Sequence, residues 1–265
     1  MFVIAENINM MSGSLGAALK EQDRTPIQDM AKRLVAAGAD ALDVNLGPAR
    51  KDGEAQMAFL VDCLAEVSST QLCLDTTNAA AMEAGIVRCA ELGLPKPILN
   101  SFSLQRDKLE NILPLAAKYE CEVIGLTMES SIPVTFEERL NLAFELATYA
   151  NEAGIPNSKI IIDPVVLPLG VDVGQQHAVA VRQVIASMPD MFDPPVRTVC
   201  GLSNISNGAP QGLRAPINGV FMSMLAGAGL SCVIADSTDS ELMRSVRLIK
   251  ALRNESLYSP SDAEI

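Results

Sequence analysis

The sequence predicts an α/β fold in the form of a single (β/α)8 barrel that spans residues 1–265. Three observations support this prediction. Short apolar stretches recur along the chain, eight in all. A helical pattern follows each stretch, and each stretch ends on a polar side chain. Eight such units in a chain of this length are typical of a barrel of parallel strands.

The apolar stretches are rich in Val, Ile, Leu and Cys, as expected for strands that are buried on both faces. Leu72, Cys73 and Leu74, for example, lead directly into Asp75. A core strand has no structural need for a carboxylate at its end, because an unpaired buried charge is costly. The predicted strands cover residues 2–5, 41–44, 71–74, 97–99, 123–126, 160–162, 198–202 and 232–235.

Amphipathic helical patterns fill the intervals between these strands. In the first, Ile27, Ala31 and Leu34 share one helix face. Thr135 and Ser240 are predicted N-caps, because a side-chain oxygen there can accept from the first free backbone N–H groups. The predicted helices cover residues 26–37, 54–67, 79–92, 104–119, 136–151, 175–188, 217–228 and 240–252.

A doubly wound open sheet is the alternative α/β architecture. Its nucleotide-binding versions carry GxGxxG or a P-loop in the first βα turn, and Gly13 and Gly16 fit neither spacing. In a barrel the carboxyl ends of all strands meet at one face, where active sites lie. The polar strand ends then form one ring, which consists of Glu6, Asn7, Asn45, Asp75, Asn100, Thr127, Asp163, Asn204 and Asp236.

Composition narrows the class of protein. The chain is 49% hydrophobic, which excludes a disordered protein, and its net charge of −12 offers no basic surface for nucleic acid. No apolar run is long enough to span a membrane, and the N-terminus does not have the pattern of a signal peptide. The six cysteines show no CxxC pairing and are expected to be reduced and mostly buried. We therefore expect a cytoplasmic protein.

Several kinds of catalysis fit the ring poorly. No lysine follows a strand, which argues against a Schiff-base aldolase. The only histidine, His177, is expected at the surface or at a helix cap rather than in a Ser-His-Asp triad. Glu6, Asp75 and Asp236 could supply oxygen ligands to magnesium, but no close acidic cluster marks a metal site, so none is predicted.

Carboxylates and primary amides suit a neutral heterocycle that is rich in N–H donors. A carboxylate can accept two parallel hydrogen bonds from an amino group and a neighbouring ring N–H, and an Asn amide both donates and accepts. A pterin has such an edge, with its 2-amino group, N3–H and 4-oxo group.

The chain resembles the pterin-binding barrels, and within them the methyltetrahydrofolate:corrinoid methyltransferases. The resemblance runs over essentially the whole chain, with one motif at each strand. The motifs are ENIN (6–9), ALDVNLGP (41–48), LCLDTTN (72–78), ILNS (98–101), IGLTM (124–128), IDPVVLP (162–168), GLSNIS (201–206) and IADS (234–237).

The resemblance implies a set of site residues. Asp75, Asn100 and Asp163 would hold the pterin, and Asn204 would approach N5, the atom that carries the methyl group. The other implied substrate-binding residues, from the GLSN motif and the loop beyond it, are Gly201, Ser203, Asn207 and Arg214.

The resemblance also implies an activity. The enzyme would move a methyl group, in either direction, between N5 of 5-methyltetrahydrofolate and the cobalt of a corrinoid (cobalamin) carried on a separate protein. Such an enzyme would be a methyltransferase (EC 2.1.1) of one-carbon metabolism, and the family resemblance suggests a homodimer. Two alternatives remain open, a dihydropteroate synthase-like enzyme and a non-catalytic folate-binding subunit. Against the first, the GLSNIS motif has no lysine with which to hold a pyrophosphate product.

Overall fold

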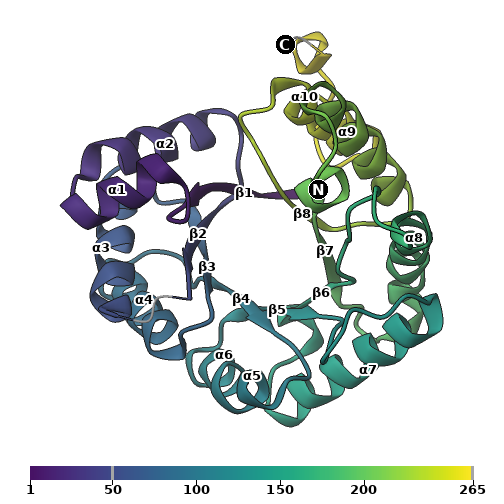
Figure 1. Ribbon diagram of the computed structural model, residues 1–265, viewed down its shortest axis with the longest axis horizontal. Helices are drawn as coiled ribbons and strands as arrows, with labels where there is room; N and C mark the ends of the chain where they lie inside the picture. The colour runs from purple at the N-terminus through teal and green to yellow at the C-terminus, as the bar shows by residue number, and fades with distance from the viewer. Residues whose placement is uncertain (49–50, 264–265) are drawn as a thin grey trace.

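Eight parallel strands pair in the order of the chain, and β1 closes onto β8, in the computed structural model (Figure 1). The structure describes residues 1–48 and 51–263. The helices form a ring outside the strands, so the predicted (β/α)8 barrel is confirmed. The strands are β1 (Phe2–Asn9), β2 (Ala41–Gly47), β3 (Gln71–Thr76), β4 (Ile98–Phe102), β5 (Glu122–Leu126), β6 (Ile160–Asp163), β7 (Arg197–Gly201) and β8 (Cys232–Ala235).

The helices follow the predicted patterns with three differences. A short helix α1 (Gly13–Glu21) was not predicted, and α9 begins six residues before the predicted start and contains Pro216. The predicted helix 104–119 is two helices, because Pro114 lacks an N–H and starts a new first turn. Besides α1, the α-helices are α2 (Arg24–Ala36), α3 (Gly53–Ala65), α4 (Ala79–Glu91), α5 (Arg106–Asn111), α6 (Leu113–Tyr119), α7 (Phe136–Glu152), α8 (Gly174–Met191), α9 (Gln211–Gly227) and α10 (Ser240–Leu252).

One predicted N-cap is confirmed and the other is wrong. Thr135 caps α7 in a complete capping box with Glu138. At α10 the cap is Asp239 instead of Ser240, and its carboxylate accepts from the Leu242 N–H at 3.1 Å. The chain therefore uses the residue that gives both a side-chain acceptor and a negative charge at the helix N-terminus.

The inside of the barrel begins with one apolar layer, to which every strand contributes one buried residue. Because strand side chains alternate between two faces, these residues point inward while their neighbours pack against the helices. The layer consists of Ile4, Ala41, Cys73, Ile98, Ile124, Ile161, Val199 and Cys232. It fills the barrel below the carboxyl ends of the strands.

Strand pairing becomes irregular near those carboxyl ends. The register shifts between Ala5 and Ile8 in β1, between Asn45 and Gly47 in β2, and around Ser101 in β4. Such bulges redirect side chains and are common beside active sites. They lie at the level of the predicted polar ring.

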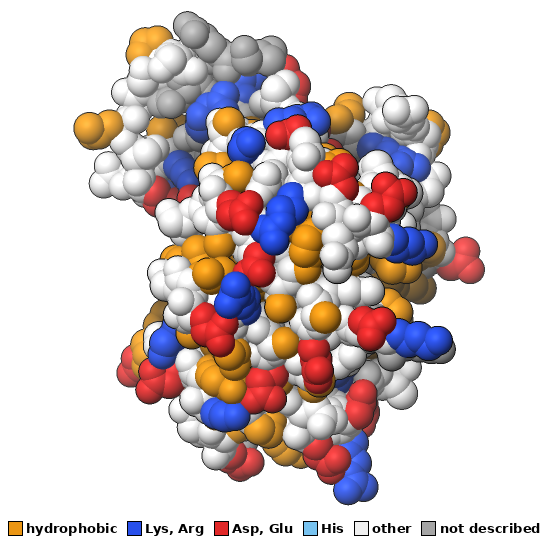
Figure 2. Space-filling view, turned by 90° about the vertical axis from the view of Figure 1, so that its left-hand side faces the viewer, with side chains coloured by type: hydrophobic (Ala, Val, Ile, Leu, Met, Phe, Trp, Pro, Cys, Tyr) orange, Lys and Arg blue, Asp and Glu red, His pale blue; other side chains and the backbone are white. Residues whose placement is uncertain are grey.

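The outer surface on the side of α1 to α4 carries acidic and basic side chains interspersed with small apolar areas (Figure 2). Ion pairs such as Arg24 with Glu66 and Arg88 with Asp62 join neighbouring helices there. All six cysteines are free and buried, as predicted. None of the described helices has the length and apolar character needed to cross a membrane.

Candidate functional site

A polar layer lies directly above the apolar layer of the barrel. Moving two residues toward the carboxyl end of each strand returns to the inward face. That step leads to Glu6, Asp43, Asp75, Asn100, Leu126, Asp163, Gly201 and Ile234. All of these except Leu126 line a cavity of about 500 Å³, together with Asn7, Asn9, Asn45, Asn204 and Asp236. This volume is in the range of small-molecule sites.

The cavity contains eight of the nine residues of the predicted ring. Thr127 is the exception, because it is fully buried directly after β5 and does not line the cavity. Five of the predicted site residues line this cavity together, which are Asp75, Asn100, Asp163, Gly201 and Asn204.

Asp43 is the main site residue that the sequence prediction missed. It lies inside β2 rather than at its end, and it is 3% exposed. Burial, and then repulsion by Asp75, raises the pKa of Asp43 to about 8, so this carboxyl group is protonated at neutral pH. The available signal was a charged residue in an otherwise apolar buried strand.

Hydrogen bonds fix the orientation of Asn100 and Asp75. The Asn100 Nδ2 group donates to Asp43 Oδ1 at 3.3 Å, and the Asn45 Nδ2 group donates to Asp75 Oδ2. The Oδ1 atom of Asn100 and the Oδ1 atom of Asp75 have no donor among the described residues. Burial raises the pKa of Asp75 to about 6, against the lowering effects of Lys108 and Asn45. Two neighbouring strands thus present acceptors that a ligand can use.

Asp163 ends β6 on the opposite side of the cavity and is 8% exposed. Its Oδ1 accepts from the Val165 N–H at 2.7 Å. Burial raises its pKa to about 6, while the Val165 N–H and the charge of Arg139 lower it. Asp163 is therefore ionised at neutral pH and protonated below about pH 6.

His177 was expected at the surface or at a helix cap, but it is buried and the N-cap position of α8 is Val173. The side chain is 1% exposed in the first turn of α8, where Arg139 donates to its Nδ1. Contacts between α7 and α8 bury it, and such contacts between distant parts of the chain are not visible in sequence periodicity.

Glu6 and Asp236 form the other wall of the cavity. Ser203 donates its hydroxyl to Glu6, and the Asn7 Nδ2 group donates to Asp236 Oδ1 at 2.7 Å. Burial raises the pKa of Glu6; the Ser203 hydroxyl opposes this effect and Asp236 adds to it. Glu6 is therefore a carboxyl group that can exchange a proton closer to neutrality than an exposed glutamate can.

Gly201 and Asn204 are in close contact at the end of β7. Asn204 lies in the short helical turn η2 (Leu202–Ser206), and its Nδ2 would be only 3.0 Å from a Cβ placed on Gly201. A side chain at position 201 would therefore displace the Asn204 amide. The glycine is required for close approach rather than for a special backbone angle.

The remaining predicted residues surround a second cavity of about 480 Å³. Ser203, Asn207 and Arg214 line it, and it shares Glu6, Asn204 and Asp236 with the first cavity. The predicted residues therefore divide between two adjoining cavities, with Asn204 in both. Arg214 donates to the Ala209 carbonyl at 3.0 Å, which holds it near η2.

The carboxyl groups that line the first cavity meet amide, hydroxyl and backbone N–H groups. Among the described residues, no ion pair joins a lysine or arginine to Glu6, Asp43, Asp75, Asp163 or Asp236. Within the same part of the chain, no group of three His, Cys, Asp or Glu residues is arranged to hold a metal ion. The polar layer consists mainly of hydrogen-bond acceptors, so it matches a ligand that offers several N–H donors.

Comparison with known proteins agrees with this chemistry. A family model described as "Pterin binding enzyme" matches residues 6–236. A methylcorrinoid:tetrahydrofolate methyltransferase of Eubacterium limosum is 27% identical over 255 residues, which cover 95% of this chain and 91% of that protein. A methionine synthase of Mycobacterium tuberculosis is 27% identical over 272 residues, covering 97% of this chain and 22% of that protein.

Among solved structures, Xanthomonas albilineans dihydropteroate synthase with 4-aminobenzoic acid has the same fold. The TM-score is 0.68 at 16% sequence identity, covering 97% of this chain and 93% of that chain. The barrel, the acceptor-rich layer and the family match over most of the chain lead to one conclusion. This chain belongs to the family of pterin-binding enzymes.

Proposed function

We propose that this enzyme transfers a methyl group between N5 of 5-methyltetrahydrofolate and the cobalt of a corrinoid carried on a separate protein. The observation that supports the proposal best is the position of Asn204, between an acceptor-rich pterin pocket and a second open cavity. The similarity to a protein named methylcorrinoid:tetrahydrofolate methyltransferase, over 95% of this chain, supports the same reaction.

Asp75, Asn100 and Asp163 would hold the pterin ring. Asp75 would accept from the 2-amino group and N3–H. Asn45 donates to only one of its two oxygens, the other oxygen has no donor among the described residues, and each carboxylate oxygen can accept more than one hydrogen bond. Asn100 would accept at Oδ1, since its Nδ2 is held by Asp43. A pocket with this many acceptors rejects ligands that lack matching donors, because buried groups would then remain unpaired.

Asn204 would act at N5 when the methyl group moves. The reduced corrinoid, when its protein is docked, supplies the nucleophile. The methyl carbon would bond to the corrinoid as the N5–methyl bond breaks, the electron pair of that bond would stay on N5, and N5 would gain a proton. Asn204 cannot supply that proton, but a hydrogen bond from its amide can strengthen as charge changes at N5. Glu6, which shares both cavities with Asn204, would relay the proton through water.

Gly201, Ser203, Asn207 and Arg214 would complete the substrate site. Gly201 would leave room for the ring and the Asn204 amide, and Ser203 would hold Glu6 in place. Asn207 and Arg214 border the second cavity and would meet the part of the folate that extends beyond the pterin. The corrinoid protein would dock over the carboxyl ends of the strands.

The direct test is an anaerobic spectrum. Chemically reduced Co(I) cobalamin and 5-methyltetrahydrofolate are mixed with the enzyme, and the Co(I) absorbance band is followed. We expect an enzyme-dependent loss of this band. Folate binding without methyl transfer, with cobalamin and also with a corrinoid protein, would favour the folate-binding subunit instead.

Asn204→Ala separates catalysis from binding. We expect turnover to fall on the order of 100-fold or more, because a transition-state hydrogen bond is lost, while the Kd for folate changes much less. Calorimetry and the Co(I) assay measure the two quantities. If both activity and affinity stay at the wild-type level, Asn204 merely lines the pocket.

A dihydropteroate synthase activity has less support. The fold similarity at 16% identity does not carry a function. Among the described residues that line the two cavities, Arg214 is the only basic one, which leaves little to hold a pyrophosphate. Formation of dihydropteroate from 4-aminobenzoate and a pterin pyrophosphate would overturn this assignment.

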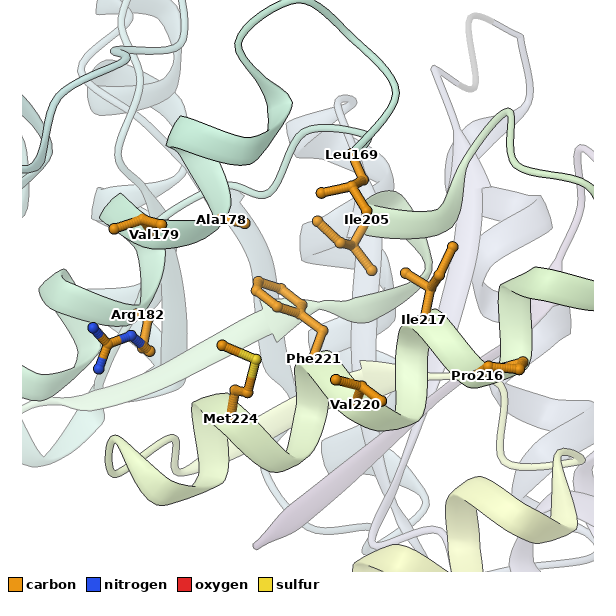
Figure 3. Close-up of a pocket in the computed structure, with 10 residues that line it drawn as sticks. All are labelled: Leu169, Ala178, Val179, Arg182, Ile205, Pro216, Ile217, Val220, Phe221 and Met224. Carbon is orange, nitrogen blue, oxygen red and sulfur yellow. The ribbon is translucent and has the colours of Figure 1, made fainter.

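We also propose a homodimer in which α9 packs against α9 of a second copy. Figure 3 shows the apolar groove between α8 and α9, where Val179, Val220 and Met224 are each more than half exposed. A second, mostly apolar groove borders α9 on the side of α10. A helix with a groove on each side suits self-complementary packing, in contrast to the mixed charges in Figure 2. Light scattering should give twice the mass of one chain.

The cytoplasmic location stays a prediction.

A further inference from the structure

Arg139 is an arginine of α7 whose side chain is fully buried. It has no exposed surface, and by volume it is the largest of the fully buried side chains among the described residues. No ion pair among the described residues includes it. Removing a guanidinium from water without such a partner is unfavourable, so its hydrogen bonds must serve a particular part of the structure.

Those hydrogen bonds converge on the turn that follows Asp163. The Arg139 Nη1 group donates to the carbonyl of Pro164 and, at 2.7 Å, to that of Val165. The Nη2 group donates to His177 Nδ1, which requires the neutral imidazole with its proton on Nε2. Burial, and then the charge of Arg139, lowers the pKa of His177, which keeps it neutral.

The turn needs this support because Val165 has a left-handed backbone. Its φ is +57°, a conformation that is unfavourable for a β-branched residue. In this conformation the Val165 N–H reaches back to Asp163 Oδ1 at 2.7 Å. The two carbonyls held by Arg139 flank that N–H, so the arginine, the strained turn and the carboxylate form one connected unit.

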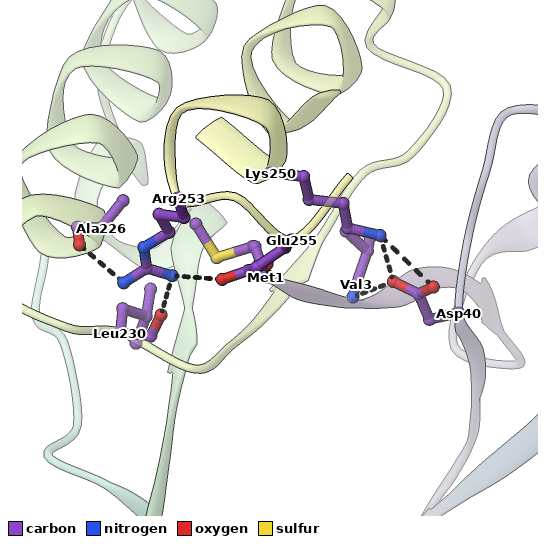
Figure 4. Close-up of polar contacts among 8 residues, drawn as sticks. All are labelled: Met1, Val3, Asp40, Ala226, Leu230, Lys250, Arg253 and Glu255. Atoms are coloured by element: carbon purple, nitrogen blue, oxygen red, sulfur yellow. Dashed lines mark hydrogen bonds and ion pairs between the residues drawn. The ribbon is translucent and has the colours of Figure 1, made fainter. Parts of the chain in front are cut away.

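A second arginine, Arg253, also donates to two backbone carbonyls and serves as a comparison. Arg253 donates to the carbonyls of Leu230 and Ala226 at 2.9 and 2.8 Å near the amino ends of the strands (Figure 4). Its side chain is 25% exposed and has Glu255 as an acidic partner. An arginine can therefore bind two backbone carbonyls while its side chain remains partly exposed. The buried Arg139 differs because its positive charge also acts on Asp163.

We propose that Arg139 is a positioning residue for the pterin site, which holds the turn 163–165 so that the Asp163 carboxylate meets the ligand in one fixed place. His177 has a supporting role, because it fixes the second amino group of the guanidinium. The inference rests on the proposed function, in which Asp163 binds the pterin.

The test compares Arg139→Lys with Arg253→Lys as the matched control. A lysine keeps the charge but lacks the planar fork that spans two carbonyls and an imidazole. Calorimetry measures the Kd for 5-methyltetrahydrofolate, and carboxyl NMR follows the titration of Asp163 in the ligand-free protein. We expect Arg139→Lys to weaken folate binding at least 10-fold and to shift the Asp163 titration. Arg253→Lys should leave both within twofold of wild type, even if its Tm falls equally.

The role is refuted if Arg139→Lys lowers only the Tm and leaves the Kd and the Asp163 titration at the values of Arg253→Lys. If Arg139→Lys does not fold, His177→Leu and His177→Gln replace it. Leucine removes the acceptor and should weaken binding, whereas the Gln oxygen restores the acceptor and should rescue it. Equal affinities for these two would also refute the role. If the wild type does not bind folate, the proposed function fails, while the NMR titration still tests the link between Arg139 and Asp163.

Discussion

The two ends of the barrel surround their carboxylates differently. At the amino ends of the strands, partly buried carboxylates have basic partners, as in Asp40 with Lys250 and Glu122 with Arg197. Figure 4 shows one of these groups, in which Asp40 also accepts from the Val3 N–H at 2.8 Å. At the carboxyl ends, carboxylates instead meet amides, hydroxyls and one another.

This difference separates stability from function. Ion pairs such as those of Asp40 and Glu122 satisfy charges at the amino end within the folded chain. At the carboxyl end, burial raises the pKa of several carboxyl groups, and the hydrogen bonds and charges of the chain offset this rise only in part. Such uncompensated groups cluster at functional sites, where a ligand supplies the missing partners.

The largest change in folate affinity is expected when one carboxylate is neutralised at each end of the barrel and the two variants are compared. Asp75→Asn should weaken 5-methyltetrahydrofolate binding on the order of 100-fold or more, because charged hydrogen bonds contribute roughly 1.5–3 kcal/mol each. The ligand-free protein should become no less stable, since a carboxylate whose charge is disfavoured by burial is replaced by a neutral amide. Calorimetry and urea unfolding measure the two effects.

Asp40→Asn is the matched control for that experiment. It should lower the free energy of unfolding and leave folate affinity unchanged, because Asp40 serves Lys250 and the Val3 N–H. If both substitutions changed binding and stability in the same direction, the two ends would not differ as described.

A smaller effect concerns pH and Asp43. Its pKa is raised from 3.8 to about 8, so the native state binds a proton that the unfolded state has released. The free energy of unfolding therefore falls as pH rises toward 8, by at most about 1.4 kcal/mol per pH unit. Asp75 and Asp163, with values of about 6, contribute little above pH 6.5.

Asp43→Asn should flatten this dependence between pH 6.5 and 8. Urea unfolding at several pH values gives both curves, and their difference cancels the other titrating groups. Parallel curves would mean that Asp43 is ionised in the native protein, and the account of the polar layer would be wrong at this position.

The smallest effect is expected at the amino end. Lys250→Met removes the ammonium partner of Asp40, and both side chains are about a quarter to a third exposed. Partly exposed ion pairs contribute about 0.2–1 kcal/mol, so the Tm should fall by about 1–3 °C. Calorimetric scans measure this, with folate affinity as the control. A change in affinity would show that the two ends are coupled.

The sequence predicted the strands and most of the site because both depend on local patterns. Apolar runs identified the strands, and polar residues beyond them identified Asp75, Asn100 and Asp163. Asp43 was missed because it lies within a strand rather than at its end, although counting inward positions in steps of two from the apolar layer leads to it. Arg139 and His177 meet through packing of α7 on α8, which local periodicity does not encode.

The apolar layer beneath the site has a kinetic consequence. Its eight side chains fill the barrel on the amino side of the cavity, so ligands reach the polar layer from the carboxyl end. In the proposed reaction the corrinoid protein covers that same opening. Folate must then enter first and leave last, and product release must wait for the partner to dissociate. Methyl transfer would therefore follow an ordered sequence of binding that is set by the geometry of the barrel.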